Sequence, residues 1–491
     1  MAATSDAGCT RACRSGLVLA ETCSERHLMA MSDYASPAIM HTPPFVPPVP
    51  SPAPEVMRPL DLFRRMRTNG ITVWPPSAYE EEITRRRFFG RASFVLNAPE
   101  AIRHVLVDNQ DNYAKTNATI RILQPLLGCG LFLSEGRDWR LQRRTIAPAF
   151  TPKAVNMLVP HMHSAIQQVV DELHIQTQSS VDLFTLMQHL ALEIAGRTMF
   201  SLEMKSHSLE LRDFVVRYSG TLSQPHMLDV LLPTGIPTPW DIGRKWFRRR
   251  WMHFVEQLIR ERATSGETVE VPRDLFDLLM KARDPETDKE FSPGQLRDQV
   301  ATMILAGHET TAVSLSWALY LLALAPEVQE RVADEARGAE LGKGVSLEKL
   351  DYTRAVVDET LRLYPPAYVI VRTARRSDRV AGLEVRPGDL AVVSPWLLHR
   401  HKRRWTNPDA FLPERFLPGA PPIDRYCYLP FGIGPRVCIG AHFALTEVTL
   451  ALATLIQNFR LALTDSLPVL PIAIVTTQPD RRPSFRLTFR K

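Results

Sequence analysis

Cys438 lies in a turn that holds three glycines and a proline between Phe431 and Gly440. Glycine adopts backbone conformations that other residues avoid, so this turn can close tightly around a group beside the sulfur. Apolar residues at helical spacing follow from Ala444 to Phe459. The positive end of a helix favours a thiolate, which is the form of cysteine that binds metals. The turn therefore predicts a metal-ligating cysteine, with a buried structural cysteine as the alternative.

An acid and a hydroxyl stand next to each other in a second stretch, Ala306-Gly-His-Glu-Thr-Thr311. The Thr310 hydroxyl can compete for a backbone carbonyl of its helix and open a small groove there. His308 and Glu309 also begin the motif of zinc proteases, but Ala312 stands where that motif needs its second histidine. Zinc is therefore excluded, and the acid–hydroxyl pair is left as a candidate for moving protons.

A long helix must carry this pair. Ser292-Pro-Gly-Gln295 has the spacing of a capping box with proline at the first helical position, and Pro326 marks the end. Roughly 33 residues at about 1.5 Å each give a rod near ~50 Å, long enough to cross a large domain. Its apolar length would suit a membrane span, but an acid near the middle makes insertion cost about 2.5–3.5 kcal/mol. We therefore expect a buried helix of a globular fold.

The turn around Cys438 matches the pattern Phe-Gly-x-Gly-x-Arg-x-Cys-x-Gly at every fixed position. It resembles the haem-binding loop of the cytochrome P450 superfamily, and Ala306–Thr311 resembles the oxygen-activating motif of that family. The other motifs appear in the family's order over residues 60–491. The resemblance is to soluble bacterial members. It implies a mainly α-helical fold with a smaller β region that encloses haem b.

The resemblance also implies roles for individual residues. Cys438 would ligate the haem iron, and Glu309 and Thr310 would relay protons to dioxygen. Arginine suits the haem propionates because its planar fork pairs with carboxylates in a bidentate way. The residues implied to bind the cofactor are Trp139, Arg143, Ala306, Gly307, Arg372, Phe431, Gly432, Arg436, Cys438 and Gly440, with His399 as a further propionate partner.

Glu359 and Arg362 stand three residues apart on a predicted helix, which alone indicates only a common surface pair. By resemblance, Arg415 joins them in a buried ion network behind the cysteine loop. Removing one partner of such a network costs about 3–5 kcal/mol. We therefore expect these three residues to be structural and needed for haem incorporation.

The implied reaction is monooxygenation, in which O2, two electrons and two protons place one oxygen atom in a small lipophilic substrate by hydroxylation or epoxidation. About fifty residues follow Gly440, which leaves no room for a fused reductase, so a separate ferredoxin and ferredoxin reductase are expected. One alternative is a peroxide-driven peroxygenase or a non-oxidative haem-thiolate isomerase, which tend to lack the Glu309–Thr310 pair. A haem-based gas sensor is another.

Composition limits the class of protein. The 491 residues carry a net charge of +6, an excess too small for a dedicated nucleic-acid binder. Six cysteines without a Cys-x-x-Cys pair favour a reducing, cytoplasmic setting. No apolar segment suited to an N-terminal membrane anchor is present. Arg400-His-Lys-Arg-Arg404, with Arg140 and Arg144, is either solvated surface or a docking site for an acidic electron-transfer protein.

Residues 1–59 are expected to be a disordered, proline-rich leader, either a stiff tail or a segment packed on the body, and residues 60–491 a single catalytic domain. A helix is expected from Pro99. Residues 244–250 should form a solvated basic face with two buried aromatic rings. The predicted strands are 71–74, 88–96 with a bend at Gly90, 369–375, 380–393, 459–463 and 485–489.

Overall fold

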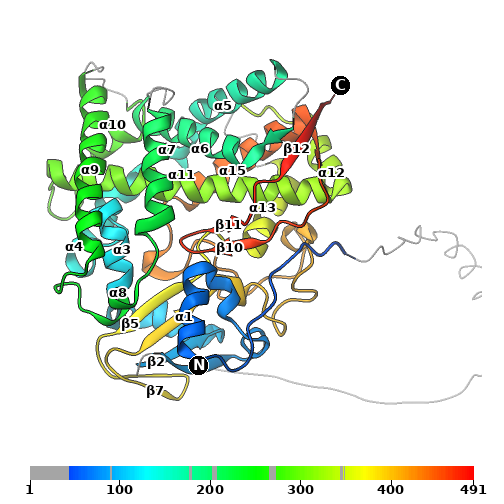
Figure 1. The fold of residues 1–491 in the computed structure, drawn as a ribbon. Coiled ribbons are helices and arrows are strands. Elements are labelled where there is room, and N and C mark those ends of the chain that lie inside the picture. The colour runs from blue at the N-terminus through cyan, green and yellow to red at the C-terminus, as the bar shows by residue number, and fades with distance from the viewer. Residues whose placement is uncertain are drawn as a thin grey trace, which may run out of the picture. The chain divides into compact units, whose positions relative to one another are not determined.

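Helix α11 (Pro293–Leu324) runs through the middle of the folded chain in the computed structural model (Figure 1). The Ser292 hydroxyl accepts from Gln295 N at 3.3 Å, and Gln295 Oε1 accepts from Ser292 N at 3.0 Å. The predicted capping box is therefore confirmed. The predicted stop is also confirmed, because α11 ends at Leu324 and Pro326 starts the next helix. Nearly all of its second half is buried, as expected for a core helix.

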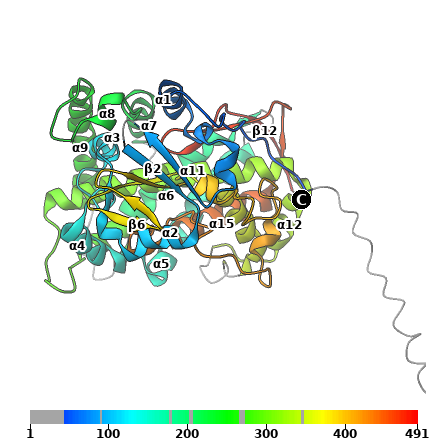
Figure 2. The ribbon, with the colours of Figure 1, turned by 90° about the horizontal axis from the view of Figure 1, so that it is seen from below.

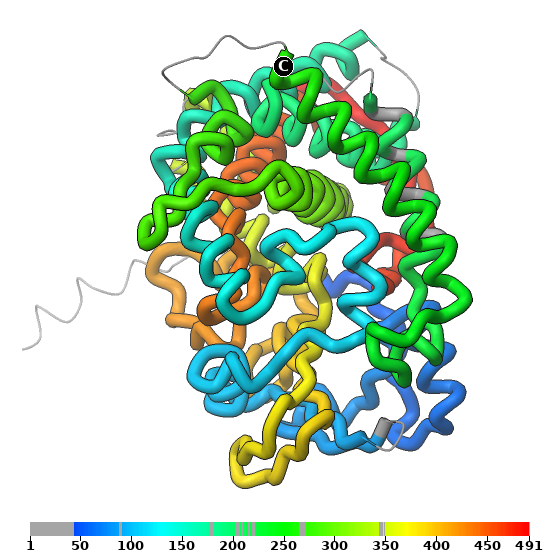
Figure 3. Tube along the Cα trace, turned by 90° about the vertical axis from the view of Figure 1, so that its left-hand side faces the viewer, coloured from blue at the N-terminus to red at the C-terminus, as the bar shows by residue number. Residues whose placement is uncertain are grey.

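The structure describes residues 44–88, 91–175, 180–201, 207–264, 272–342, 347 and 349–490. Residues from Phe45 onward form one compact unit. Helices pack around α11 on several sides, as Figure 3 shows with α11 seen nearly end-on. The remaining helices are α1 (Pro59–Thr68), α2 (Pro99–Arg103), α3 (Asn117–Leu127), α4 (Gly136–Ile146), α5 (Pro152–Ile175), α6 (Leu183–Phe200), α7 (Ser208–Arg217), α8 (Met227–Leu231), α9 (Trp240–Thr264), α10 (Leu275–Met280), α12 (Pro326–Arg337), α13 (Asp351–Leu363), α14 (Pro395–Leu398) and α15 (Ala441–Asn458).

The strands form a smaller β region. A five-stranded sheet has the order β1-β2-β8-β5-β3, in which only the β2–β8 pair is parallel among the described strands. It lies on the near side of α11 when the molecule is seen from below (Figure 2). A second sheet has the order β4-β12-β9, and two hairpins are β6–β7 and β10–β11. The strands are β1 (Ile83–Phe88), β2 (Arg91–Leu96), β3 (Tyr113–Lys115), β4 (Val181–Asp182), β5 (Ile370–Ala374), β6 (Asp378–Val380), β7 (Leu383–Val385), β8 (Leu390–Val393), β9 (Phe459–Leu463), β10 (Pro471–Ala473), β11 (Thr477–Pro479) and β12 (Ser484–Phe489).

One strand prediction was wrong. The stretch 71–74 lies mostly in a 3₁₀ helix, Gly70–Val73, because the Asn69 side chain accepts from Ile71 N and caps it. The predicted strand 88–96 is confirmed from Arg91 onward as β2, which pairs antiparallel with β1, while the bend expected at Gly90 lies outside the described residues. The other predicted strands are confirmed in position, although 380–393 is divided among β6, β7 and β8. The helix at Pro99 is α2, as predicted.

The described part of the proline-rich leader is extended. Phe45 O accepts from Phe411 N at 2.9 Å, and Ala53 N donates to Trp74 O at 2.8 Å. Pro47 and Ala53 are buried. This part of the leader therefore packs on the body, whereas residues 1–43 lie outside the described residues. The boundary at residue 59 stays a prediction.

A membrane-spanning helix was one alternative for α11. Within the described ranges, no single helix has both the length and the apolar character needed to cross a membrane. The pair α11 and α12 satisfies that test only jointly, with a bend of 114° between the two helices.

Candidate active site

The Cys438 turn owes its shape to its glycines. Gly432 and Gly434 have φ angles of 72° and 77°, in the region that favours glycine. A side chain at Gly434 would also come within 2.4 Å of Leu106 O. Cys438 N donates to Phe431 O at 2.9 Å and closes the turn. Helix α15 begins three residues after the cysteine, as the apolar pattern predicted.

Opposing effects act on the ionisation of Cys438. Burial raises the pKa of its thiol, while the Gly440 N–H and Arg143 lower it by smaller amounts. The side chain is nevertheless exposed. The helix end therefore acts toward the thiolate, as the sequence predicted, although in the polypeptide alone the loss of hydration has the larger effect on the pKa. A bound metal cation would supply the missing stabilisation and deprotonate the thiol outright.

Two neighbouring residues in the middle of the otherwise buried helix α11 are exposed. Ala306 and Gly307 are exposed, while Ile304, His308 and Thr311 nearby are buried. A Cβ added to Gly307 would meet no atom within 4 Å, so open space lies beside this turn. Open space beside a core helix and an exposed thiol in a glycine-rich turn are what a large planar cofactor requires.

The Thr310 hydroxyl donates to Ala306 O at 2.6 Å. This is the backbone contact that the sequence predicted for a hydroxyl at this position. The carbonyl that receives it belongs to Ala306, one of the two residues exposed in the middle of the helix. The hydroxyl is therefore held at the edge of the open space.

Glu309 is held from a distant part of the chain. Its Oε1 accepts from Thr476 Oγ1 at 2.8 Å and from Gln478 Nε2 at 2.6 Å. Burial raises the pKa of Glu309, and these two hydrogen bonds oppose that rise. The sequence gave no signal that Thr476 and Gln478 hold the acid, since more than 160 residues separate them from Glu309.

Two further ionisable groups lie at this part of the structure, one on α11 and one on α15. His308 Nε2 lies 2.9 Å from Gln188 O on α6, and burial lowers the pKa of His308 to about 4. Its imidazole is therefore neutral, and no role had been assigned to it. Glu447 of α15 is buried next to Thr311, and burial raises its pKa to about 8. The sequence gave no indication of this second buried carboxyl.

Several basic side chains cluster in one part of the structure, beside the Cys438 turn. Arg143 donates to Val437 O at 2.8 Å, and Arg436 donates to Ser134 O at 3.0 Å. The Arg436 guanidinium lies 4.5 Å from the ring centre of buried Trp139, so the structure shows this tryptophan stacked on an arginine. Burial and the neighbouring Arg436 lower the pKa of Arg372 to about 10.

Lys115 belongs to the same group and was missed from the sequence. It faces Arg372 across the β3–β5 pair, and its buried Nζ has no hydrogen-bond partner. Burial, with Arg436 and Arg372 nearby, lowers the pKa of Lys115 to about 7. An unpartnered buried ammonium is costly, so this cluster fits an anionic group. A lone lysine in a short strand has no sequence signature.

The predicted structural network is brought together. Glu359 and Arg362 are both fully buried, with Arg362 Nε 2.6 Å from Glu359 Oε2. Arg415 Nε lies 3.4 Å from Glu359 Oε1. Glu359 also accepts from Leu412 N at 2.8 Å, so its carboxylate ties α13 to the segment before Arg415.

His399 does not reach a cofactor. It is buried, its Nε2 accepts from Leu429 N at 2.8 Å, and its Nδ1 lies 3.1 Å from Arg362 O. Both ring nitrogens are therefore occupied by backbone groups, and the expectation of a propionate contact was wrong. Burial and Arg362 lower the pKa of His399 to about 3, which keeps the ring neutral.

The basic run 400–404 presents less free charge than its sequence suggested. Arg400 and His401 are buried. Lys402 pairs with Glu80 at 2.7 Å, and Arg404 pairs with Glu82. Arg140 and Arg144 pair with Asp111 and with Asp284, respectively. Lys402, Arg404, Arg140 and Arg144 are therefore paired at the surface, and the two alternatives for this run, solvated surface and a docking site for an acidic electron-transfer protein, both stay predictions.

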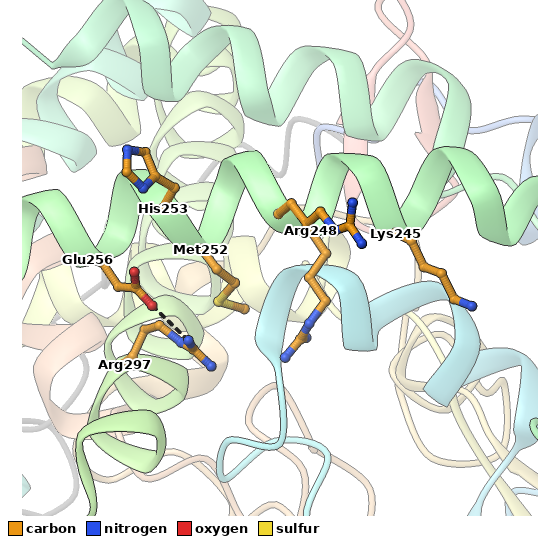
Figure 4. A pocket seen from close by; sticks show the side chains of 7 residues that line it. Lys245, Arg248, Met252, His253, Glu256 and Arg297 are labelled. Carbon is orange, nitrogen blue, oxygen red and sulfur yellow. Dashed lines mark hydrogen bonds and ion pairs between the residues drawn. The ribbon is translucent and has the colours of Figure 1, made fainter.

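A separate surface pocket of about 480 Å³ lies between α9 and the start of α11 (Figure 4). It is mostly basic, and its one acid, Glu256, pairs with Arg297 at 2.7 Å. The basic face predicted for 244–250 is only partly confirmed: Phe247 is buried, Trp246 is 60% exposed, and Arg244 is buried against Asp229. The lining residues are Lys245, Arg248, Arg249, Met252, His253, Glu256 and Arg297, and the predicted site residues are not among them.

Comparison with known proteins decides the family. The family model for cytochrome P450 matches residues 47–481. The chain belongs to the cytochrome P450 family. A cyclooctat-9-en-7-ol 5-monooxygenase of Streptomyces melanosporofaciens is 34% identical over 74% of this chain and 79% of its own length. A pentalenene oxygenase of Streptomyces avermitilis is 29% identical over 83% of this chain and 90% of its own.

The same family appears among solved structures. The crystal structure of a cytochrome P450DA heme domain matches 90% of this chain and 99% of its own, with a TM-score of 0.73 and 25% identity. The predicted P450 fold, mainly α with a smaller β region, is confirmed. This P450 is an oxidoreductase, a monooxygenase with haem b as cofactor. Haem b supplies the redox-active iron at which dioxygen is reduced.

Proposed function

We propose that this P450 inserts one oxygen atom from O2 into a lipophilic substrate, in the cytoplasm, with electrons from a separate ferredoxin and ferredoxin reductase. The observation that carries the proposal is the acid–hydroxyl pair of α11 at the open space beside Gly307. Glu309 is partly buried and accepts hydrogen bonds from Thr476 and Gln478, and Thr310 donates at the edge of that space. Such a pair can pass protons while bulk water is kept out.

In this proposal each site residue has one task. Cys438 ligates the iron through its thiolate. Arg143, Arg372, Arg436 and Lys115 pair with the haem propionates, and Trp139 supports Arg436 by stacking. The remaining residues line the macrocycle: Ala306, Gly307, Phe431, Gly432 and Gly440.

The substrate class is proposed from the names of two relatives. The relatives are named for cyclooctat-9-en-7-ol and pentalenene, whose endings denote an alkenol and an alkene. We therefore propose a hydrocarbon-like substrate with few polar groups, which is hydroxylated or epoxidised. Binding would be detected as a high-spin shift when such compounds are titrated against the ferric haem spectrum.

Replacing Thr310 with alanine is expected to lower product formed per electron pair by about tenfold and to release hydrogen peroxide, since a positioned proton donor is worth about 10²–10⁴ in rate. Product, NAD(P)H and peroxide are measured with the reconstituted partners. Ser316→Ala is a matched control, because Ser316 makes the same kind of bond to Ala312 O on the same helix. Unchanged coupling in Thr310→Ala would favour a peroxygenase or isomerase, and absence of product with every substrate would favour a gas sensor.

Replacing Lys115 with methionine is expected to speed haem loss by about tenfold, because a charge-assisted hydrogen bond is worth about 1.5–3 kcal/mol. The methionine keeps the length of the buried stem and removes only the charge. Haem transfer to apomyoglobin measures the rate. Lys153→Met, at an exposed position of α5, is the control. Equal rates in both variants would contradict a propionate contact for Lys115.

A further inference from the structure

The hairpin β10–β11 carries the two donors that hold Glu309. Ala473 pairs with Thr477, and Ile472 pairs with Gln478, so residues 474–476 form the tip. Thr476 ends the tip, directly before β11, and Gln478 lies within β11. Both reach the same oxygen, Glu309 Oε1, at 2.8 and 2.6 Å. The second oxygen, Oε2, receives no hydrogen bond from the described residues.

The hairpin is fixed to the core on its other side. Thr477, between the two donors, donates through its hydroxyl to Pro365 O at 2.7 Å and through its N–H to Pro366 O at 3.2 Å. Trp317 of α11 donates to Thr477 O at 2.7 Å. Thr477 is fully buried. The donors are thus held in place by the same helix that carries the acid.

We infer that Thr476 and Gln478 are positioning residues, which fix Glu309 through Oε1 and leave Oε2 as the oxygen that takes up and gives away the proton. This inference rests on the proposed function of Glu309. A carboxyl group free to rotate would present either oxygen to solvent and to the open space. With Oε1 occupied by two donors, rotation would break both hydrogen bonds, so proton transfer is confined to one oxygen.

The inference predicts the sign of a pKa change. Both donors favour the ionised acid, so removing either raises the pKa of Glu309. A cation in place of Gln478 lowers it. Among the described residues, no charged group adds to the shift of Glu309. The other titratable groups near this turn are His308, His189 of α6 and Glu447 of α15, of which Glu447 has its pKa raised to about 8.

The experiment is an infrared titration of the resting ferric enzyme, which needs no turnover. The carboxyl band of Glu309 is identified by its loss in Glu309→Gln, and Glu447→Gln separates the second buried acid. We expect the midpoint to rise by about one pH unit in Gln478→Leu and Thr476→Val, and to fall by a similar amount in Gln478→Arg. Gln457→Leu is the matched control, since Gln457 donates to Ala336 O on α12.

The pH at which turnover falls should shift in the same directions as the infrared midpoint. An acid acts in its protonated form, so the fall in turnover at high pH moves up in Gln478→Leu and down in Gln478→Arg. If the hairpin were purely structural, the variants would shift neither the acidic nor the alkaline side of the pH–turnover profile, or both sides in one direction. Either result overturns the inference. Thr476→Val is nearly isosteric and serves if Gln478→Leu binds little haem. Wild-type enzyme that forms no product contradicts the proposed function instead, while the infrared titration still tests the positioning residues.

Discussion

Replacing Arg362 with alanine is expected to abolish haem incorporation. Arg362 is fully buried and donates two hydrogen bonds to Glu359, at 2.6 and 2.8 Å. It also donates to the backbone oxygens of His399, Pro408 and Ala410 at 2.6–2.9 Å. The alanine variant removes two of the hydrogen bonds of a buried carboxylate and the Arg362 donors of three carbonyls, and breaking such a network costs about 3–5 kcal/mol. A typical domain is stable by only about 5–15 kcal/mol.

The measurement is haem content per polypeptide, together with the urea midpoint of unfolding. Arg331→Ala is the control, because Arg331 makes an exposed ion pair with Glu414 that is worth about 0–1 kcal/mol. Arg362→Lys keeps the charge but loses the planar fork, so its haem content should lie between those of wild type and alanine. Full haem content in Arg362→Ala would show that the network is not structural.

Replacing Cys438 with serine is expected to remove the strongly red-shifted band of the ferrous–CO spectrum and all monooxygenation. A serine hydroxyl cannot supply the electron density that a thiolate gives to the iron. The spectrum is recorded after reduction under CO. Cys129→Ser, at an exposed position before α4, should keep the band. If the band survives in Cys438→Ser, another residue ligates the iron.

The long-range contacts of the site could not be predicted from the sequence, whereas its local motifs could. The cap at Ser292, the stop at Pro326 and the cysteine turn depend on neighbouring residues, and each was predicted correctly. Lys115, Thr476 and Gln478 act through partners more than 160 residues away. Each is an ordinary residue in or directly before a short strand, and no local sequence pattern marks such a residue as functional.

Tertiary contacts also explain where the structure departs from expectation. His399 was expected from the family resemblance to contact a haem propionate, but its two nitrogens are used by backbone groups of Arg362 and Leu429. At Cys438 the Gly440 N–H acts toward the thiolate as predicted, but burial has the larger effect on the pKa of the thiol. Both effects depend on how tightly the surrounding chain packs, which the order of residues does not reveal.

The register of β3 against β5 has a consequence for folding. Lys115 and Arg372 are directly opposite each other, and like charges at such a position destabilise a sheet. Strand β3 is only three residues long and lies at the edge of its sheet. Its pairing is therefore electrostatically frustrated until an anion stands between the two cations. In this P450 the cofactor's carboxylates would act as a folding ligand, and local stability of the sheet edge would be thermodynamically linked to cofactor occupancy.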